Sequence, residues 1–204
     1  RSHASVLGIA APAAAIVSYT VQSRTQLVSP ITGAAGDFSI GKLSTPLNPA
    51  HGIAQYPILL YNSLSDYVGQ SVLMYGHNDL TTNSTIIGTN TIVGFAHYDL
   101  YNNDGINDTF AAGYSFEPAS PGDSQFEGGD SGSPTFAFFQ GRLAIVGTHS
   151  ATATLSGTQY SFDNFIPVYL DQLSALNVLF TTVPEPSRVM LLMLGCTLML
   201  RRRR

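Results

Sequence analysis

A glycine-rich stretch in the second half of the chain carries the residues best suited to chemistry. It reads Gly-Gly-Asp-Ser-Gly-Ser-Pro from Gly128 to Pro134. A serine hydroxyl becomes a nucleophile when a neighbouring base takes its proton. Glycines allow tight turns whose free N–H groups bind an anion, as the oxyanion of acyl transfer requires. The pattern indicates a nucleophile at Ser131; the alternative is an ordinary Gly/Ser turn between two strands.

The residues that follow Ser131 make the pattern more specific. An apolar run, Thr135–Phe139, is followed by a turn at Gln140-Gly141-Arg142 and a second apolar run. In this context the stretch resembles the Gly-Asp-Ser-Gly-Gly-Pro signature of chymotrypsin-like serine proteases, with Ser133 in place of the last glycine. The resemblance implies a Ser-His-Asp triad, an oxyanion hole made by the N–H groups of Gly129 and Ser131, and peptide hydrolysis without a metal or organic cofactor.

A triad also needs an acid, and the best candidate is Asp37. The segment Asp37-Phe38-Ser39-Ile40, followed by Leu43, resembles the Asp-Ile-Ala-Leu segment of that family, which likewise ends near a proline. Asp37 precedes Ser131 by 94 residues, as the family leads one to expect. The alternative is an aspartate at a loop edge that starts a strand.

Five histidines compete for the role of the base. The family order of His, Asp and Ser leaves only His3, because the other four follow Asp37. Ser2-His3-Ala4 faintly resembles the family's Thr-Ala-Ala-His segment, so we expect His3 to be the base and the early strands of the first lobe to precede this sequence. The alternatives are an ordinary surface histidine at this position, or a true base that is missing from the sequence.

The strand after the nucleophile predicts part of a substrate pocket. Gly147-Thr148-His149 is similar to the Gly-x-His segment of glutamyl endopeptidases, which implies that His149 recognises an acidic substrate side chain. The resemblance also places Ser150 beside the substrate and Gln125, six residues before Ser131, near the pocket floor. An equal competitor for His149 is packing against the nucleophile loop.

Composition restricts the classes of function that remain. The chain has 204 residues, 44% of them apolar and only 11% charged, with 19 glycines and 11 prolines, as is typical of a secreted, turn-rich β protein. Four basic residues face twelve acidic ones before Pro184. So acidic a body argues against nucleic-acid binding, because few cations remain to neutralise phosphates. The one cysteine, Cys196, leaves the body without a disulfide.

The elements that must position these residues are mostly short strands. Alternation over residues 16–22 predicts a strand paired with residues 25–28, and Asp163 or Asn164 is expected to cap a helix over residues 163–177. We expect an all-β fold of two antiparallel barrels, as in the chymotrypsin-like family. Residues 1–45 would be the remnant of the first barrel, 46–55 a linker, and 56–162 the second barrel.

The last residues resemble a sorting signal. A Pro-Glu-Pro triplet at 184–186, an uncharged apolar segment at 189–200 and four terminal arginines are similar to the PEP-CTERM signal of Gram-negative bacteria, which here covers about residues 182–204. The resemblance implies export, transient anchoring in the inner membrane and processing by an exosortase-type enzyme. The alternative, an ordinary tail anchor, also tethers the exported body to a membrane.

Two functions are therefore expected from the sequence. The first is an exported, membrane-tethered serine endopeptidase of the cell envelope that hydrolyses polypeptides through His3, Asp37 and Ser131. The second is a catalytically inactive protein that keeps the protease fold as an adhesion or scaffold module on the surface.

Overall fold

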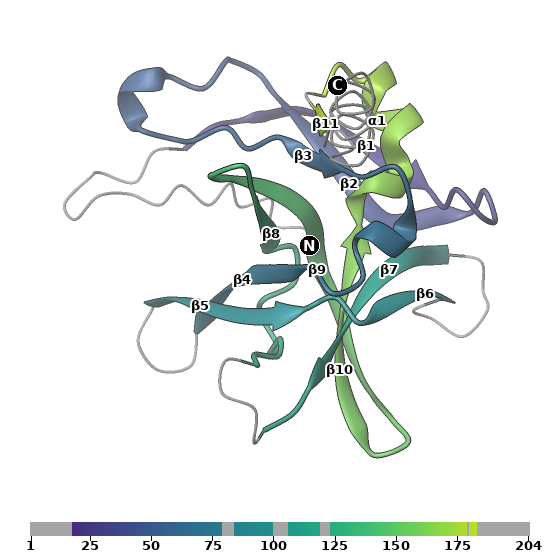
Figure 1. The fold of residues 1–204 in the computed structure, drawn as a ribbon. Coiled ribbons are helices and arrows are strands. Elements are labelled where there is room, and N and C mark those ends of the chain that lie inside the picture. Colours follow the sequence, from purple (N-terminus) through teal and green to yellow (C-terminus); the bar gives the residue numbers. More distant parts are fainter. Residues whose placement is uncertain (1–17, 79–83, 100–105, 119–122, 179, 183–204) are drawn as a thin grey trace, which may run out of the picture.

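The computed structural model describes residues 18–78, 84–99, 106–118, 123–178 and 180–182. Eleven strands form one mostly antiparallel sheet, together with a few short helical turns (Figure 1). The strands are β1 (Val21–Val28), β2 (Ala35–Leu43), β3 (Ile58–Leu60), β4 (Ser71–Asn78), β5 (Ser84–Thr91), β6 (Gly94–Asp99), β7 (Ile106–Phe116), β8 (Pro134–Phe139), β9 (Arg142–Leu155), β10 (Thr158–Phe165) and β11 (Phe180–Thr182). The prediction of a fold built mostly of β-strands is confirmed.

The main ladder runs in the order β1-β2-β7-β10-β9-β8-β4-β5. The remaining strands join it from the side: β6 pairs with β7, and β3 pairs with β9 and β11. Most neighbours are antiparallel, whereas the contacts of β2 with β7, of β3 with β9 and of β3 with β11 are parallel and at most three residue pairs long. The ladder is open as paired, with β1 and β5 at its ends.

Two tight hairpins follow directly from the sequence. Gln140 and Gly141 connect β8 to β9, and Ser156 and Gly157 connect β9 to β10; all four residues have positive φ. Two-residue turns with positive φ at both positions match the right-handed twist of paired strands, which explains the glycine in each turn. These turns fix the register of β8, β9 and β10, the three strands that border the glycine-rich loop.

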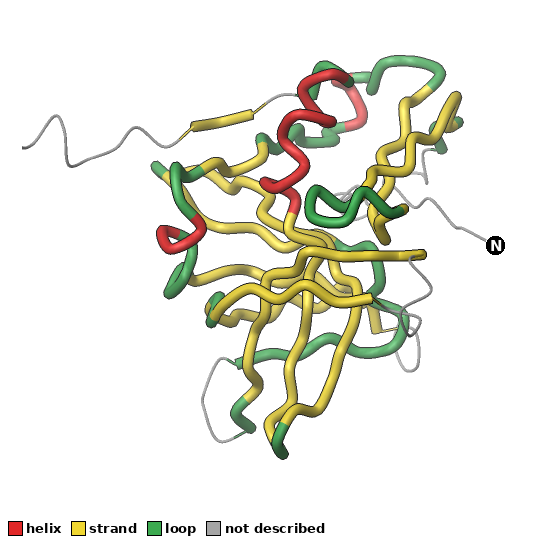
Figure 2. The backbone as a smooth tube through the Cα atoms, turned by 90° about the vertical axis from the view of Figure 1, so that its right-hand side faces the viewer, coloured by secondary structure: helices red, strands yellow, loops and turns green. Residues whose placement is uncertain are grey.

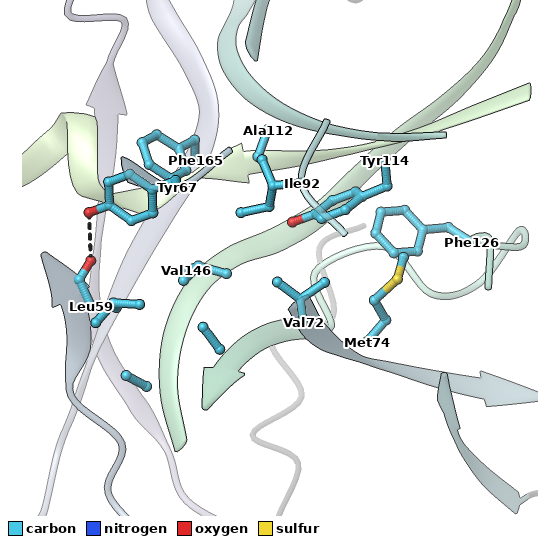
Figure 3. Packing of buried hydrophobic residues seen from close by; sticks show 12 residues of the cluster. Leu59, Tyr67, Val72, Met74, Ile92, Ala112, Tyr114, Phe126, Val146 and Phe165 are labelled. Carbon is cyan, nitrogen blue, oxygen red and sulfur yellow. Dashed lines mark hydrogen bonds between the residues drawn. The ribbon is translucent and has the colours of Figure 1, made fainter. Parts of the chain in front are cut away.

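Buried side chains form two clusters. The larger cluster lies among β3 to β10 and includes Leu59, Tyr67, Tyr114 and Phe165 (Figure 3). The Tyr67 ring meets Phe165 edge to face with centroids 4.8 Å apart, and its hydroxyl donates to the Leu59 carbonyl. Tyrosine suits this position because its ring is buried while its polar end finds an acceptor.

The smaller cluster joins the closing helical segment to β1 and β3. It contains Leu27 of β1, Ile58 of β3, and Ile166, Tyr169 and Leu173 of the closing helical segment. That segment consists of the 3-10 turn η3 (Ile166–Tyr169) and the helix α1 (Leu170–Ala175). Figures 1 and 2 show it at the same end of the molecule as the β1–β2 hairpin.

Two element predictions were wrong in their bounds. The closing helical segment begins at Ile166 rather than at residue 163, because Asp163 and Asn164 are the buried end of β10 and cap nothing. Residues 25–28 are not the partner of residues 16–22; they continue β1, whose partner is β2. The expected sorting signal lies outside the described residues from residue 183 onwards.

Candidate active site

The glycine-rich loop between β7 and β8 holds Ser131 at the surface. The Asp130 carboxylate is buried and accepts from the Glu127 N–H at 2.9 Å, while the Ser133 N–H donates to the Asp130 carbonyl at 2.9 Å. Gly129 and Gly132 both have positive φ, at 111° and 83°. These glycines allow a compact loop in which Asp130 points inward and Ser131 remains exposed.

Two N–H groups of this loop are available to a ligand. Within the described part of the chain, neither the Gly129 nor the Ser131 N–H has a hydrogen-bond acceptor. An exposed turn with unsatisfied N–H groups can bind an oxyanion, which makes these the two donors that the sequence predicts for an oxyanion hole.

The loop is attached to β9 directly after Ser131. The Gly132 N–H donates to the His149 carbonyl at 2.8 Å, and the His149 N–H donates to the Ser133 carbonyl at 2.8 Å. The backbone of His149 therefore fixes the position of the two residues that follow Ser131.

The next residue of β9, Ser150, reaches the predicted acid. Its hydroxyl donates to Asp37 Oδ2 at 2.7 Å and accepts from the Tyr98 hydroxyl at 3.1 Å. A register shift between β10 and β9 makes this possible, because Phe162 pairs with Ala151 whereas Asp163 pairs with His149, so Ser150 is the extra residue. Such bulges redirect a side chain locally. Ser150 thus contacts Asp37, the predicted acid.

Asp37 is oriented by its neighbours at only one carboxylate oxygen. Oδ2 accepts from Ser150 and, at 3.5 Å, from Asn164, while the described residues supply no donor to Oδ1. Burial raises the pKa of Tyr98, and the charge of Asp37 adds to the rise, so the tyrosine keeps the proton that it donates towards Ser150. Ser150 and Asn164 therefore hold the carboxylate in place through Oδ2.

His149 is buried, and both of its ring nitrogens are engaged. Nε2 lies 2.7 Å from the Tyr75 carbonyl, which only accepts, so Nε2 carries a proton. Nδ1 lies 2.8 Å from Asp163 Oδ1, and the ring stacks on Phe126 with centroids 3.5 Å apart. The ring has no free nitrogen for the Ser131 proton or for an acidic substrate. The packing interpretation of His149 is therefore the one that the geometry favours.

None of the three histidines whose side chains are described contacts Ser131 or Asp37. His51 bonds to the Tyr19 hydroxyl at 2.6 Å, and His97 lies 3.4 Å from Asp108. His149 is engaged as described above. The predicted base, His3, lies outside the described residues. The consecutive residues His149 and Ser150 thus contact the glycine-rich loop and Asp37, respectively.

A cavity of about 280 Å³ lies beneath the loop. Its described lining includes Gln125, Phe126, Asp130, His149, Tyr75 and Gly76. Gln125 therefore borders a cavity, as expected for a pocket residue, but Ser131 is not among the described residues that line it. The cavity adjoins the inner side of the loop, where Asp130 points.

Sequence reasoning missed the buried polar residues of β10. Asp163 and Asn164 contact His149 and Asp37 respectively, whereas the sequence predicts that one or the other caps a helix. The available signal was Gly147, a glycine inside an apolar strand, which indicates close approach of another group. A Cβ at this position would lie 2.6 Å from the side chain of Asp163.

Comparison with known proteins adds no identification. The sequence matches no protein-family model and no curated protein. No helix within the described ranges has the length and apolar character needed to cross a bilayer.

Proposed function

We propose that this chain is a serine endopeptidase that cleaves peptide bonds by acyl transfer. One observation carries the proposal: Ser131 is exposed on a loop with two available N–H groups, and the strand that holds this loop also places Ser150 on Asp37. A nucleophile loop and an oriented acid attached to consecutive residues of one strand form two of the three parts of a triad.

The reaction proceeds in two halves. Ser131 Oγ attacks the peptide carbonyl and gives its proton to the base, which we assign to His3, with Asp37 stabilising the imidazolium. The N–H groups of Gly129 and Ser131 bind the oxyanion, and one such donor typically contributes about 3 kcal/mol. The base then protonates the leaving amine as the C–N bond breaks. Water attacks the acyl-enzyme by the same route and releases the acid product.

The strand pairings support a chymotrypsin-like arrangement for this proposal. β5 and β6 are separated only by Ile92 and Val93. If they are counted as one bent strand, the pairings run through β4, β5/β6, β7, β10, β9 and β8 and return to β4. This circuit is what a second barrel would require, and β1 and β2 would belong to the first barrel.

Location and processing follow from the tail. We propose that the protein is exported to the envelope of a Gram-negative bacterium, that residues 189–200 anchor it transiently in the inner membrane, and that an exosortase-type enzyme processes it near the Pro-Glu-Pro triplet. The basis is the similarity of residues 182–204 to a PEP-CTERM signal.

Labelling with a fluorophosphonate probe tests the activity. The full-length protein should be labelled, and Ser131→Ala should remove the label because the probe reacts only with an activated serine. Ser174→Ala, at an exposed serine of α1, is the matched control and should label like the wild type. A label that survives Ser131→Ala would contradict the proposal.

A second function, an inactive protease-fold module for adhesion or scaffolding, is favoured by one observation. Among the described histidine side chains, none reaches Ser131 or Asp37. The same experiment separates the two functions: a folded full-length protein that never reacts with the probe would support the inactive module. Loss of labelling in His3→Ala would instead support the enzyme and its assigned base.

A further inference from the structure

Two consecutive polar residues are buried at the end of β10. Asp163 is 0% exposed and Asn164 is 3% exposed. Burying a carboxylate and an amide is costly unless new hydrogen bonds replace their hydrogen bonds with water. The hydrogen-bond partners of Asp163 and Asn164 therefore show which parts of the protein these side chains hold in place. Their partners lie in different parts of the candidate active site.

Asp163 is connected to the nucleophile loop. Its Oδ1 lies 2.8 Å from His149 Nδ1, and its Oδ2 accepts from the Tyr114 hydroxyl at 2.6 Å. His149 in turn is fixed to β4 through the Tyr75 carbonyl and carries the loop through its own backbone. Asp163 therefore acts on Ser131 through the position of a single histidine.

Asn164 is connected to the acid. Its Nδ2 donates to the Asp37 carbonyl at 3.0 Å and lies 3.5 Å from Asp37 Oδ2. Its Oδ1 accepts from the Thr109 hydroxyl at 3.0 Å, so the amide cannot rotate without losing both contacts. The hydrogen bond to the Asp37 carbonyl matters most, because it fixes the backbone of β2 directly after the two residues that pair with β7.

We propose that Asp163 and Asn164 are a pair of positioning residues that set the separation between the nucleophile and the acid. Neighbouring residues in a strand direct their side chains to opposite faces across one rigid peptide unit. One residue holds the loop of Ser131 and the other holds Asp37, so any shift of β10 moves both together. This inference rests on the proposed endopeptidase function.

The competing explanation is that the two residues only stabilise the fold. A purely structural role would lower stability without changing how the reaction of the folded protein depends on pH. A positioning role would change that dependence, because Asp37 governs the charge of the base. The charge of Asp37 acts on Tyr98 and Tyr169, whose pKa values are raised mainly by burial, so both stay neutral while the base titrates. Asp163 also acts on Tyr98, and Asp108 also acts on Tyr169.

The experiment measures the fluorophosphonate labelling rate of the full-length protein as a function of pH, together with its urea unfolding. Asp163→Asn and Asn164→Asp nearly preserve side-chain volume. Each should slow labelling about tenfold to a hundredfold, as expected for misplacement of a catalytic group. In Asn164→Asp the midpoint of the pH profile should also rise, because a second carboxylate near Asp37 stabilises the protonated base. Gln159→Ala, an exposed position on the same strand, should leave the rate and midpoint unchanged.

The outcomes separate this inference from the proposed function. A wild-type protein that does not react would overturn both. A wild type that reacts through Ser131, with Asp163→Asn and Asn164→Asp indistinguishable from Gln159→Ala, would overturn the positioning role alone. If Asn164→Asp does not fold, Thr109→Val replaces it as the test variant, because it removes only the hydrogen bond to the side-chain carbonyl of Asn164. It should then slow labelling with an altered pH profile, and an unchanged profile would count against the inference.

Discussion

At the scale of single residues, the candidate site depends on places where a side chain must be absent. Gly147 pairs with Thr135 on β8 and with Phe165 on β10, deep in the sheet. A Cβ at this position would lie 2.6 Å from both the Cβ and Oδ2 of Asp163. The glycine therefore provides the space through which the carboxylate reaches His149.

Gly147→Ala should lower the free energy of unfolding by about 1–3 kcal/mol, the typical cost of overpacking a buried site. Gly94→Ala is the matched control, since no atom lies within 4 Å of its would-be Cβ and its φ is not positive. The control should be neutral or slightly stabilising, because alanine restricts the unfolded chain. Urea unfolding measures both; equal stabilities of the two variants would contradict the role assigned to Gly147.

The glycine-rich loop around Ser131 could be predicted from the sequence, whereas the surroundings of Asp37 could not, for a physical reason. A nucleophile loop is a local feature, so glycine spacing around Ser131 indicates it directly. The environment of Asp37 depends instead on an extra residue in β9, whose position is decided by pairing between distant strands. Alternation of apolar residues does not reveal a bulge, and a polar pair such as Asp163-Asn164 is typical of helix caps as well as of buried networks.

At the scale of elements, α1 is hydrogen-bonded to β1, the edge strand of the sheet. The Gln172 side chain accepts from the Val28 N–H and donates to the Val28 carbonyl, both at 2.9 Å. An amide that satisfies both backbone groups of one residue replaces a neighbouring strand at this point. It joins the closing helical segment to the β1–β2 hairpin, which carries Asp37 on β2.

Gln172→Ala should lower the free energy of unfolding by about 1–2 kcal/mol, as expected for two hydrogen bonds of about 0.5–1.5 kcal/mol each at a partly exposed site. It should also speed hydrogen exchange at the Val28 amide. Ser174→Ala, in the same helix, should change neither quantity. Unchanged exchange at Val28 in Gln172→Ala would show that the amide contact does not hold the strand.

At the scale of the whole molecule, both buried clusters contain tyrosines that resist ionisation. Burial is the main cause that raises the pKa of Tyr67, in the larger cluster, and of Tyr169, in the smaller one, each to about 12. Burial also raises the pKa of Tyr114 far above its usual value, with the Asp163 charge adding to the effect. Alkali should therefore act on both clusters rather than on one end of the molecule.

The direction of this effect follows from proton linkage. In the unfolded chain a tyrosine loses its proton near pH 10. In the folded protein Tyr67 and Tyr169 lose theirs only near pH 12. The unfolded state thus binds fewer protons in this interval, so stability is complete below pH 10 and falls as pH rises towards 12. Urea unfolding followed across this interval should show the loss. Tyr169→Phe keeps the buried ring and removes its ionisable hydroxyl, so it should flatten the pH dependence between pH 10 and 12. An equally steep alkaline loss in Tyr169→Phe would contradict the assignment of that tyrosine.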